Sequence, residues 1–173
     1  DFKRDQHLID YVDENIIILD SVETTFQDSV PVKLDCFIIA FCIEGKTSIN
    51  INNKSHVLSA DHCAIILPNT VIRHLYNNAG CIFRIVAISS QFMKEATSSR
   101  KETWDIGFYL YNNPIFPINR NRSYKLYLYK ELALTCISEK EHPYSKEAKK
   151  HLFASIFCEL LGALHRVIPI QED

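Results

Sequence analysis

A series of short apolar or alternating runs, separated by turn residues every ~8 to 10 positions, most constrains what this chain can fold into. The series extends from residue 15 to residue 89. Gly45 and the pair Asn52-Asn53 stand in two of the intervals, and both residue types tolerate the positive φ that tight hairpins require. The pattern predicts an antiparallel sandwich or closed barrel. The expected strands are 15–19, 32–43, 46–51, 54–58, 62–67, 71–76 and 81–89.

After residue 89 the apolar residues follow a helical period. Ser89 or Ser90 can cap a short helix that ends near residue 97. Residues 101–117 are rich in aromatic side chains and are broken by Pro114 and Pro117. We therefore expect an irregular connection there, packed on the barrel.

Two longer helices are predicted in the last third of the chain. One covers about 123–137; the other begins at Ser145, a suitable N-cap, and spans roughly 22 residues or 33 Å before Pro169. The apolar stripe of the second helix is wide enough to pack internally and also contact a second chain, although an internal helix pair alone would explain it. The expected dimerisation residues are Phe153, Ile156, Phe157, Leu160, Leu161 and Leu164.

The composition fits one globular unit with a real core, since 47% of the 173 residues are apolar. We expect residues 1–118 to form the barrel and residues 119–173 a helical region. The formal charge is -2, with 19 Lys and Arg against 21 Asp and Glu and no basic block. Because phosphate binding needs a concentrated cationic face, this chain is not expected to bind nucleic acid directly.

Cysteine and histidine usage argues against metal, cofactor and catalytic chemistry. The six cysteines form no Cys-x-x-Cys pair and no secretory leader is evident, so we expect small buried hydrophobes in a reducing cytoplasm. The seven histidines are dispersed, and neither a glycine-rich phosphate loop nor a Gly-x-Ser-x-Gly elbow is present. No apolar run approaches the ~20 residues of a membrane span. We expect no metal, cofactor or membrane partner.

Several short motifs together resemble a known family. The segments in question are Ile43-Glu44-Gly45, Ile49-Asn50-Ile51-Asn52, Ala60-Asp61, Ile66-Leu67-Pro68-Asn69, His74, and Ile88-Ser89-Ser90-Gln91-Phe92 followed by helices. The first five resemble a cupin core, and the last is similar to the sensor domain of bacterial AraC-family transcription regulators. The resemblance covers nearly the whole chain, although its motifs are loose.

The resemblance implies a mainly β fold with C-terminal helices: a cupin-like double-stranded β-helix, or jelly-roll barrel, followed by a helical dimerisation segment. It also implies a helix-turn-helix DNA-binding region downstream of Asp173. The sequence departs from metal-binding cupins, which carry His-x-His and a glutamate on the strand before the first glycine. Here Ile38 stands near the glutamate position, and only His74 remains as a ligand.

The barrel interior is then expected to hold one small ligand. Ile72, His74 and Tyr76 share one strand face, although His74 can equally be a buried ring satisfied by a carbonyl. Arg84 can fix an anionic ligand or pair with a carboxylate, and Trp104 can stack on a ligand or simply pack. The candidate ligand-binding set is Cys42, Ile72, His74, Tyr76, Arg84 and Trp104.

The sequence thus predicts a homodimeric, effector-sensing part of a regulator and not an enzyme. The effector is a small molecule such as a sugar or another metabolite, and DNA is contacted only through the downstream region. Two alternatives stay open. One is a metal-free cupin isomerase or epimerase that uses His74 as acid or base with Tyr76. The other is a pairing module whose barrel is filled by its own side chains.

Overall fold

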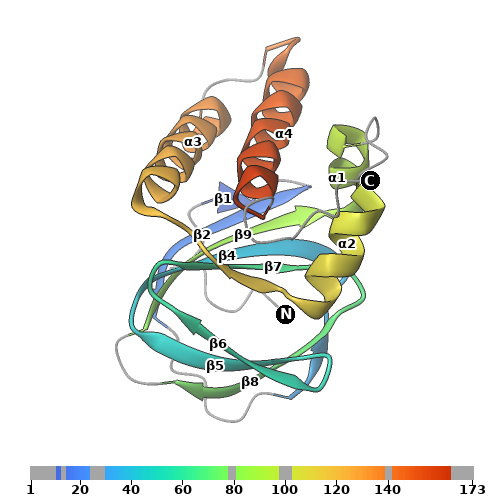
Figure 1. The fold of residues 1–173 in the computed structure, drawn as a ribbon. Coiled ribbons are helices and arrows are strands. Elements are labelled where there is room, and N and C mark those ends of the chain that lie inside the picture. Colours follow the sequence, from blue (N-terminus) through green and yellow to red (C-terminus); the bar gives the residue numbers. More distant parts are fainter. Residues whose placement is uncertain are drawn as a thin grey trace, which may run out of the picture.

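The computed structural model describes residues 11–12, 15–23, 30–77, 81–97, 103–138 and 142–164, which form two β-sheets and four helices (Figure 1). The six-stranded sheet has the order β1-β2-β9-β4-β7-β10, and the four-stranded sheet has the order β3-β8-β5-β6. The strands are β1 (Tyr11–Val12), β2 (Ile16–Glu23), β3 (Val32–Lys33), β4 (Cys36–Glu44), β5 (Lys46–Ile51), β6 (Lys54–Ser59), β7 (His62–Ile66), β8 (Val71–Asn77), β9 (Ile82–Ser89) and β10 (Ile115–Pro117).

The chain passes repeatedly between the two sheets. β4 lies in the six-stranded sheet, β5 and β6 in the other, β7 in the first again, β8 in the second and β9 in the first. Every pair of neighbouring strands is antiparallel. This is a jelly-roll barrel with C-terminal helices, which confirms the expected fold class.

The turns owe their shape to residues that accept a left-handed backbone. Gly45 joins β4 to β5 with a φ of 85°, and Asn52 and Asn53 join β5 to β6 with φ values of 48° and 65°. Asp61 and Asn69 also have positive φ, at 64° each. Asn and Asp visit this region at lower cost than other residues that carry a Cβ. The hairpin positions expected from the sequence are confirmed.

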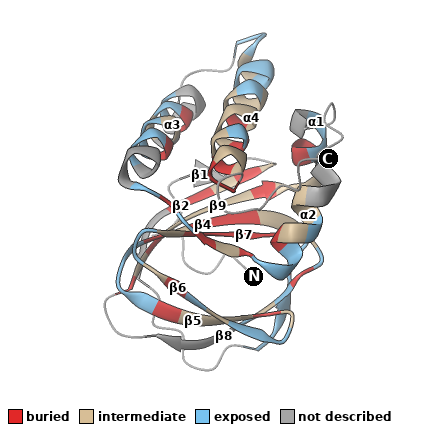
Figure 2. Ribbon diagram, viewed as in Figure 1, coloured by how far each residue is buried: buried red, intermediate tan, exposed pale blue. Residues whose placement is uncertain are grey.

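The central strands of the six-stranded sheet contribute to cores on both faces, and Figure 2 shows β4, β7 and β9 mainly as buried and intermediate residues. On β4, Ile38, Ala40 and Cys42 face the four-stranded sheet and join an inner core. The alternate residues Ile39 and Phe41 face the helices and belong to a second, outer core. Two apolar faces explain why the run through β4 is nearly uniformly apolar in place of alternating.

Four helices cover the outer face of the six-stranded sheet (Figure 1). They are α1 (Ser90–Thr97), α2 (Thr103–Asn112), α3 (Arg120–Ser138) and α4 (Ser145–Leu164). Ser89 caps α1, because the backbone N–H of Phe92 donates to its Oγ at 3.1 Å. Ser145, which the sequence predicted as the N-cap, is the first residue of α4. Its Oγ accepts from the backbone N–H of His142, which precedes the helix.

The prediction of an irregular connection over residues 101–117 is wrong. That segment contains α2 and then β10, which pairs with β7 at the edge of the six-stranded sheet. Pro114 follows α2, and Pro117 ends the edge strand, so neither proline interrupts a regular element. The prolines mark the ends of two short elements, which the sequence interpretation merged into one loop.

Candidate functional site

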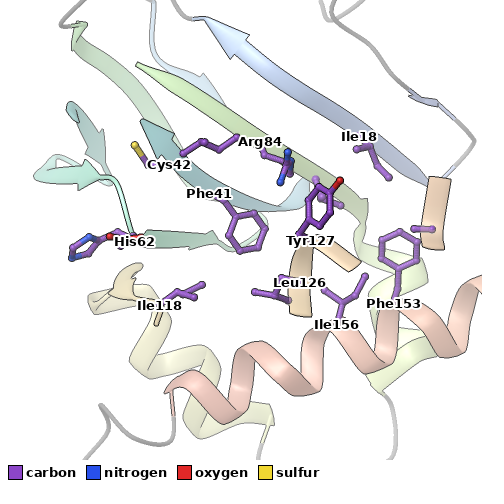
Figure 3. Close-up of a pocket in the computed structure, with 14 residues that line it drawn as sticks. Ile18, Phe41, Cys42, His62, Arg84, Ile118, Leu126, Tyr127, Phe153 and Ile156 are labelled. Atoms are coloured by element: carbon purple, nitrogen blue, oxygen red, sulfur yellow. The ribbon is translucent and has the colours of Figure 1, made fainter. Parts of the chain in front are cut away.

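A cavity of about 220 Å³ lies between the outer face of the six-stranded sheet and the helices α3 and α4 (Figure 3). Strands β2, β4 and β9 contribute Ile18, Phe41 and Val86 to its wall. Leu126, Tyr127 and Ala133 line it from α3, and Phe153 and Ile156 line it from α4. The sequence predicted a cavity between the two sheets, whereas this one lies outside the barrel and under the helices.

The chemistry of the wall is mostly apolar, with polar groups at a few points. Arg84 of β9 places its guanidinium carbon 5.4 Å from the ring centroid of Tyr127 on α3, a cation–π contact across the cavity. His62 lies at the opposite end from Phe153 (Figure 3). The Nδ1 of His62 is 3.2 Å from both Ser59 Oγ and the carbonyl oxygen of Ala60, which fixes the ring.

Contacts between the helices fix α3 and α4 over the cavity. Phe153 packs edge-on against Phe92 of α1, with ring centroids 6.0 Å apart and an interplanar angle of 86°. Lys125 of α3 and Glu159 of α4 form an ion pair at 3.1 Å. That pair is solvent-exposed and contributes at most about 1 kcal/mol, so apolar packing supplies most of the attachment.

The size and lining of the cavity limit what it can hold. An engineered cavity of roughly 150 Å³ takes up benzene, whereas drug-sized ligands occupy about 300 Å³ or more. A compact molecule of roughly ten non-hydrogen atoms therefore fits. A sugar does not suit this wall, because most of its hydroxyl groups would lose water without gaining a hydrogen-bond partner.

The predicted ligand-binding residues are only partly brought together. Cys42 and Arg84 both line the cavity. Ile72 lies on β8 in the other sheet and packs, half-buried, against the inner core. His74 and Tyr76 are also on β8, with backbones paired to Ile49 and Ser48, but their side chains lie outside the described residues. The side chain of Trp104, in the first turn of α2, is likewise not described.

Sequence reasoning missed most of the cavity wall. Phe41, Tyr127 and Ile118 were not singled out, because their role depends on which face of the sheet the helices cover. A signal was present in β4, where residues on both faces are apolar. Such a strand is covered on both sides, so an interface between sheet and helices was foreseeable.

Burial is described for five of the six cysteines, and four of these five follow the prediction at least in part. Cys42, Cys63 and Cys81 are buried and Cys36 is half-buried, but Cys158 on α4 is exposed. The side chain of Cys136 lies outside the described residues. Among the residues that the structure describes, no three His, Cys, Asp or Glu side chains gather as a metal site would require. No helix within the described ranges is long and apolar enough to cross a membrane.

No protein-family model matches the sequence, and no curated protein sequence matches it. Among solved structures, the chain is similar to a variant of apo ToxT from Vibrio cholerae, an AraC-family regulator, with a TM-score of 0.55 and 13% identity. The match covers 93% of this chain and 60% of the ToxT chain. The two share a fold. This chain therefore spans about three fifths of the length of ToxT.

Two further likenesses are looser. A second crystal form of ToxT from the same organism gives a TM-score of 0.48 at 12% identity, over 92% of this chain and 61% of that one. An RmlC-like cupin protein from Methanocaldococcus jannaschii with a double-stranded β-helix fold gives 0.39 at 13% identity, over 51% of this chain and 86% of that one. At TM-scores below 0.5, neither likeness supports a conclusion.

Proposed function

We propose that this chain is the effector-sensing and pairing part of an AraC-type transcription regulator. It takes a small, mostly apolar molecule with one anionic group into the cavity under α3 and α4. The observation that carries the proposal is the cavity itself, with its apolar wall and the guanidinium of Arg84 at one side. The shared fold with ToxT supports the regulator class. In this proposal, a helix-turn-helix region elsewhere in the whole cytoplasmic protein contacts DNA.

Arg84 sets the polarity of the expected effector. Its guanidinium lies over Tyr127 and can offer paired N–H donors to a carboxylate at a mostly apolar wall, which Asp61 and His62 also line. A carboxylate strengthens such bonds relative to a neutral acceptor. The effector is therefore expected to be a small monocarboxylate with an aromatic or branched body. A sugar, which the sequence allowed, does not match this wall.

A thermal-shift series tests the cavity. Aromatic and branched monocarboxylates of up to about ten non-hydrogen atoms are compared with their primary amides and with glucose; an occupied site at 100 times its Kd adds about 2.7 kcal/mol. We expect carboxylates to raise the melting temperature more than amides, and glucose not at all. Arg84→Met should remove the preference for the acid, whereas Arg73→Met, an exposed arginine on β8, should not. Equal responses of acids and amides would exclude this recognition mode.

The pairing surface is expected on α3 and not on the residues chosen from the sequence. Phe153, Phe157, Leu160 and Leu164 are buried in this chain's own core, and Ile156 and Leu161 pack half-buried against it. These six side chains stabilise the monomer, which leaves little of the α4 stripe for a second chain.

The outward face of α3 has the geometry that a two-fold interface requires. Tyr124, Leu128 and Leu132 follow one another at four-residue spacing and are 63%, 48% and 51% exposed. If a second copy packs antiparallel on this stripe, Leu128 meets its own counterpart on the two-fold axis and Tyr124 meets Leu132. The stripe is thus self-complementary, so we propose a second copy of this chain as its occupant.

Sedimentation tests the pairing. The protein should behave as a species near twice 20.0 kDa, and Leu128→Glu should convert it to the monomer. Phe108→Glu on α2, at a more exposed apolar position, should leave the dimer intact. A wild-type monomer at high concentration, or a dimer unaffected by Leu128→Glu, would exclude pairing through α3.

Helix α3 connects the two proposed activities. Its inner face contributes Leu126, Tyr127 and Ala133 to the cavity, and its outer face carries the pairing stripe. A ligand that displaces Tyr127 from Arg84 changes how α3 sits on the sheet. If the ligand makes better contacts with one position of α3 than with another, its binding favours that position. The dimer would then change, and with it the relative placement of the two DNA-binding regions.

The enzymatic alternative has no comparable support from the site. Both of its proposed acid–base residues, His74 and Tyr76, lie on β8, and their side chains are outside the described residues; Val71, Ile72 and Arg73, the residues of this strand with described side chains, do not line the cavity. A sugar isomerase assay with His74→Ala as control decides the matter, because turnover that the substitution abolishes would favour the enzyme.

A further inference from the structure

Two cysteines meet inside the barrel, on the face of the six-stranded sheet opposite the cavity wall. The sulfur atoms of Cys42 and Cys81 are 4.0 Å apart, and the residues are 5% and 2% exposed. Cys42 belongs to β4, and Cys81 directly precedes β9, the strand next to β4 in the sheet. Figure 3 shows the Cys42 sulfur turned away from Phe41 of the cavity wall. Both side chains belong to the inner core.

We propose that Cys42 and Cys81 form a reversible oxidation site, which a peroxide converts to a disulfide that links β4 to the start of β9. The first thiol, as thiolate, attacks a peroxide oxygen and becomes a sulfenic acid, and the peroxide O–O bond breaks. The second sulfur then attacks the sulfenic sulfur, forms the S–S bond and releases water. In sum, two thiols and one hydrogen peroxide give one disulfide and two waters, and a dithiol reductant restores both thiols.

The position of Cys42 at a strand irregularity favours this reaction. The pairing of β4 with β9 shifts register between Cys42 and Glu44, and such a bulge lets the strand bend locally. The Cys42 thiol lies 3.4 Å from the carbonyl oxygen of Glu44 and 3.6 Å from that of Gly45. These weak bonds hold the sulfur beside the bulge. The sulfur is therefore positioned at the point where β4 can move most easily towards Cys81.

The register makes the bond strained. Cys42 stands opposite Phe83, two residues beyond Cys81, so the two cysteines are diagonal neighbours. Diagonal neighbours have Cα atoms about 7–8 Å apart, whereas disulfides usually span 4.4–6.8 Å. Strained disulfides are more easily reduced and serve as labile, regulatory bonds in place of permanent ones.

The apolar surroundings favour the disulfide as a product and slow its formation. Burial, followed by the neighbouring Cys81, raises the pKa of the Cys42 thiol to about 12, and burial also raises the pKa of Cys81. A thiolate is therefore costly here, whereas a disulfide carries no charge. Oxidation is expected to proceed slowly, through brief openings of this end of β4 and β9.

Oxidation would also change the shape of the cavity wall. Cys42 borders the cavity between Phe41 and Ile43 on β4, although its sulfur faces the inner core. Arg84 follows Cys81 by three residues on the strand that would move. This consequence rests on the proposed function, because it requires a ligand in the cavity. The bond itself does not, so its formation is measured without any ligand.

Mass-spectrometric mapping of the native protein tests the site. Reduced wild-type protein is treated with hydrogen peroxide, remaining thiols are alkylated, and the digest is searched for linked peptides. We expect a peptide pair joined through Cys42 and Cys81 that dithiothreitol separates. Cys42→Ser and Cys81→Ser should each abolish it, whereas Cys63→Ser, a buried cysteine whose thiol contacts the Ala64 carbonyl, should not.

The wild-type measurement does not depend on the folding of any variant. If peroxide modifies only the exposed Cys158 and both inner cysteines are alkylated after unfolding, the proposal is overturned. A link that forms only in urea would overturn it as well, because the native contact would then play no part. If the Cys42–Cys81 disulfide forms as expected but no carboxylate raises the melting temperature, that result would count against the proposed function alone.

Discussion

The two faces of the six-stranded sheet are both apolar, yet they are used differently. The inner face packs Ile38, Ala40 and Phe83 against the four-stranded sheet in a core of largely buried residues. The outer face packs against helices and leaves a cavity of about 220 Å³ under α3 and α4. Two twisted sheets of one barrel fit each other closely, whereas helices bridge a curved sheet at separate points.

The difference bears on the proposed ligand site. A ligand between the two sheets would have to displace buried side chains from a core that both sheets enclose. A ligand under the helices contacts elements that are held by side-chain packing and by an exposed ion pair. These helices can shift at a lower cost in free energy. The outer face is therefore the better place for a ligand to change the shape of the molecule.

Matched phenylalanine truncations provide the largest test of this comparison. Phe83→Ala on the inner face should lower the free energy of unfolding by about 3–5 kcal/mol, because it leaves a void among buried side chains. Phe41→Ala on the outer face should cost about half as much, since that ring is only half-buried and already borders a cavity. Urea denaturation measures both. Equal losses would mean that the two faces pack alike.

Matched enlargements test the same difference from the other direction. Ala64→Leu on the inner face should cost roughly 1–3 kcal/mol, because the new methyl groups have no space there. Ala133→Leu, which points towards the cavity, should change stability by less than about 0.5 kcal/mol and weaken ligand binding at least tenfold. Thermal unfolding with and without ligand gives both quantities. A destabilised Ala133→Leu protein would show that the cavity is not usable space.

The link between the outer face and its helices can be weakened at one hydroxyl. Ser89 accepts from the N–H of Phe92 at 3.1 Å and donates to Asn15 Oδ1 at 2.8 Å, so it joins β9, α1 and the start of β2. Ser89→Ala should lower stability by about 1 kcal/mol, within the usual 0.5–2 for an N-cap. Ser155→Ala on α4, which loses only a bond to the His151 carbonyl, serves as the control. Equal effects in urea denaturation would assign no special role to Ser89.

The sequence predicted the barrel better than the helical layer because strand signals are local. The alternation in β5 and the Asn and Gly residues in the turns located the strands from β4 to β9 within one residue at each end, apart from the start of β4. There the single strand predicted over 32–43 is wrong, because it divides into β3 and β4, which belong to different sheets. Segment 103–117 was misassigned because Pro114 and Pro117 were interpreted as breaks within one loop. Only the pairing of β10 with β7, a contact between residues distant in sequence, shows that they flank regular elements.

The candidate site was only partly accessible to sequence reasoning for a similar reason. Arg84 was identified because it is a charge in an apolar strand, and Cys42 also borders the cavity. Tyr127 was not identified, because apolar residues occur on every side of α3. Their periodicity therefore could not show which of them face the sheet. Leu126 is buried, whereas Leu132, six residues later on the same helix, is exposed. A helix with two apolar faces requires the tertiary structure to tell them apart.

The smallest expected effect concerns the four-stranded sheet, where pH acts on stability through His56 of β6. Burial, and to a lesser degree the charge of Lys54, lowers the pKa of His56 from its ordinary value of 6.5. The unfolded chain therefore takes up the proton at a higher pH than the folded protein. As the pH falls through 6.5, the unfolded state is favoured and stability decreases, until the folded-state pKa is passed. Above that window the residue has no such effect.

His56→Gln should therefore flatten the decrease in melting temperature between about pH 7 and pH 5. Lys54→Met should leave most of the decrease, because burial is the larger cause of the shift and Lys54 the smaller one. If His56→Gln leaves the slope unchanged, other groups control the acid response. If Lys54→Met removes as much of the slope as His56→Gln, charge and not burial dominates at this position.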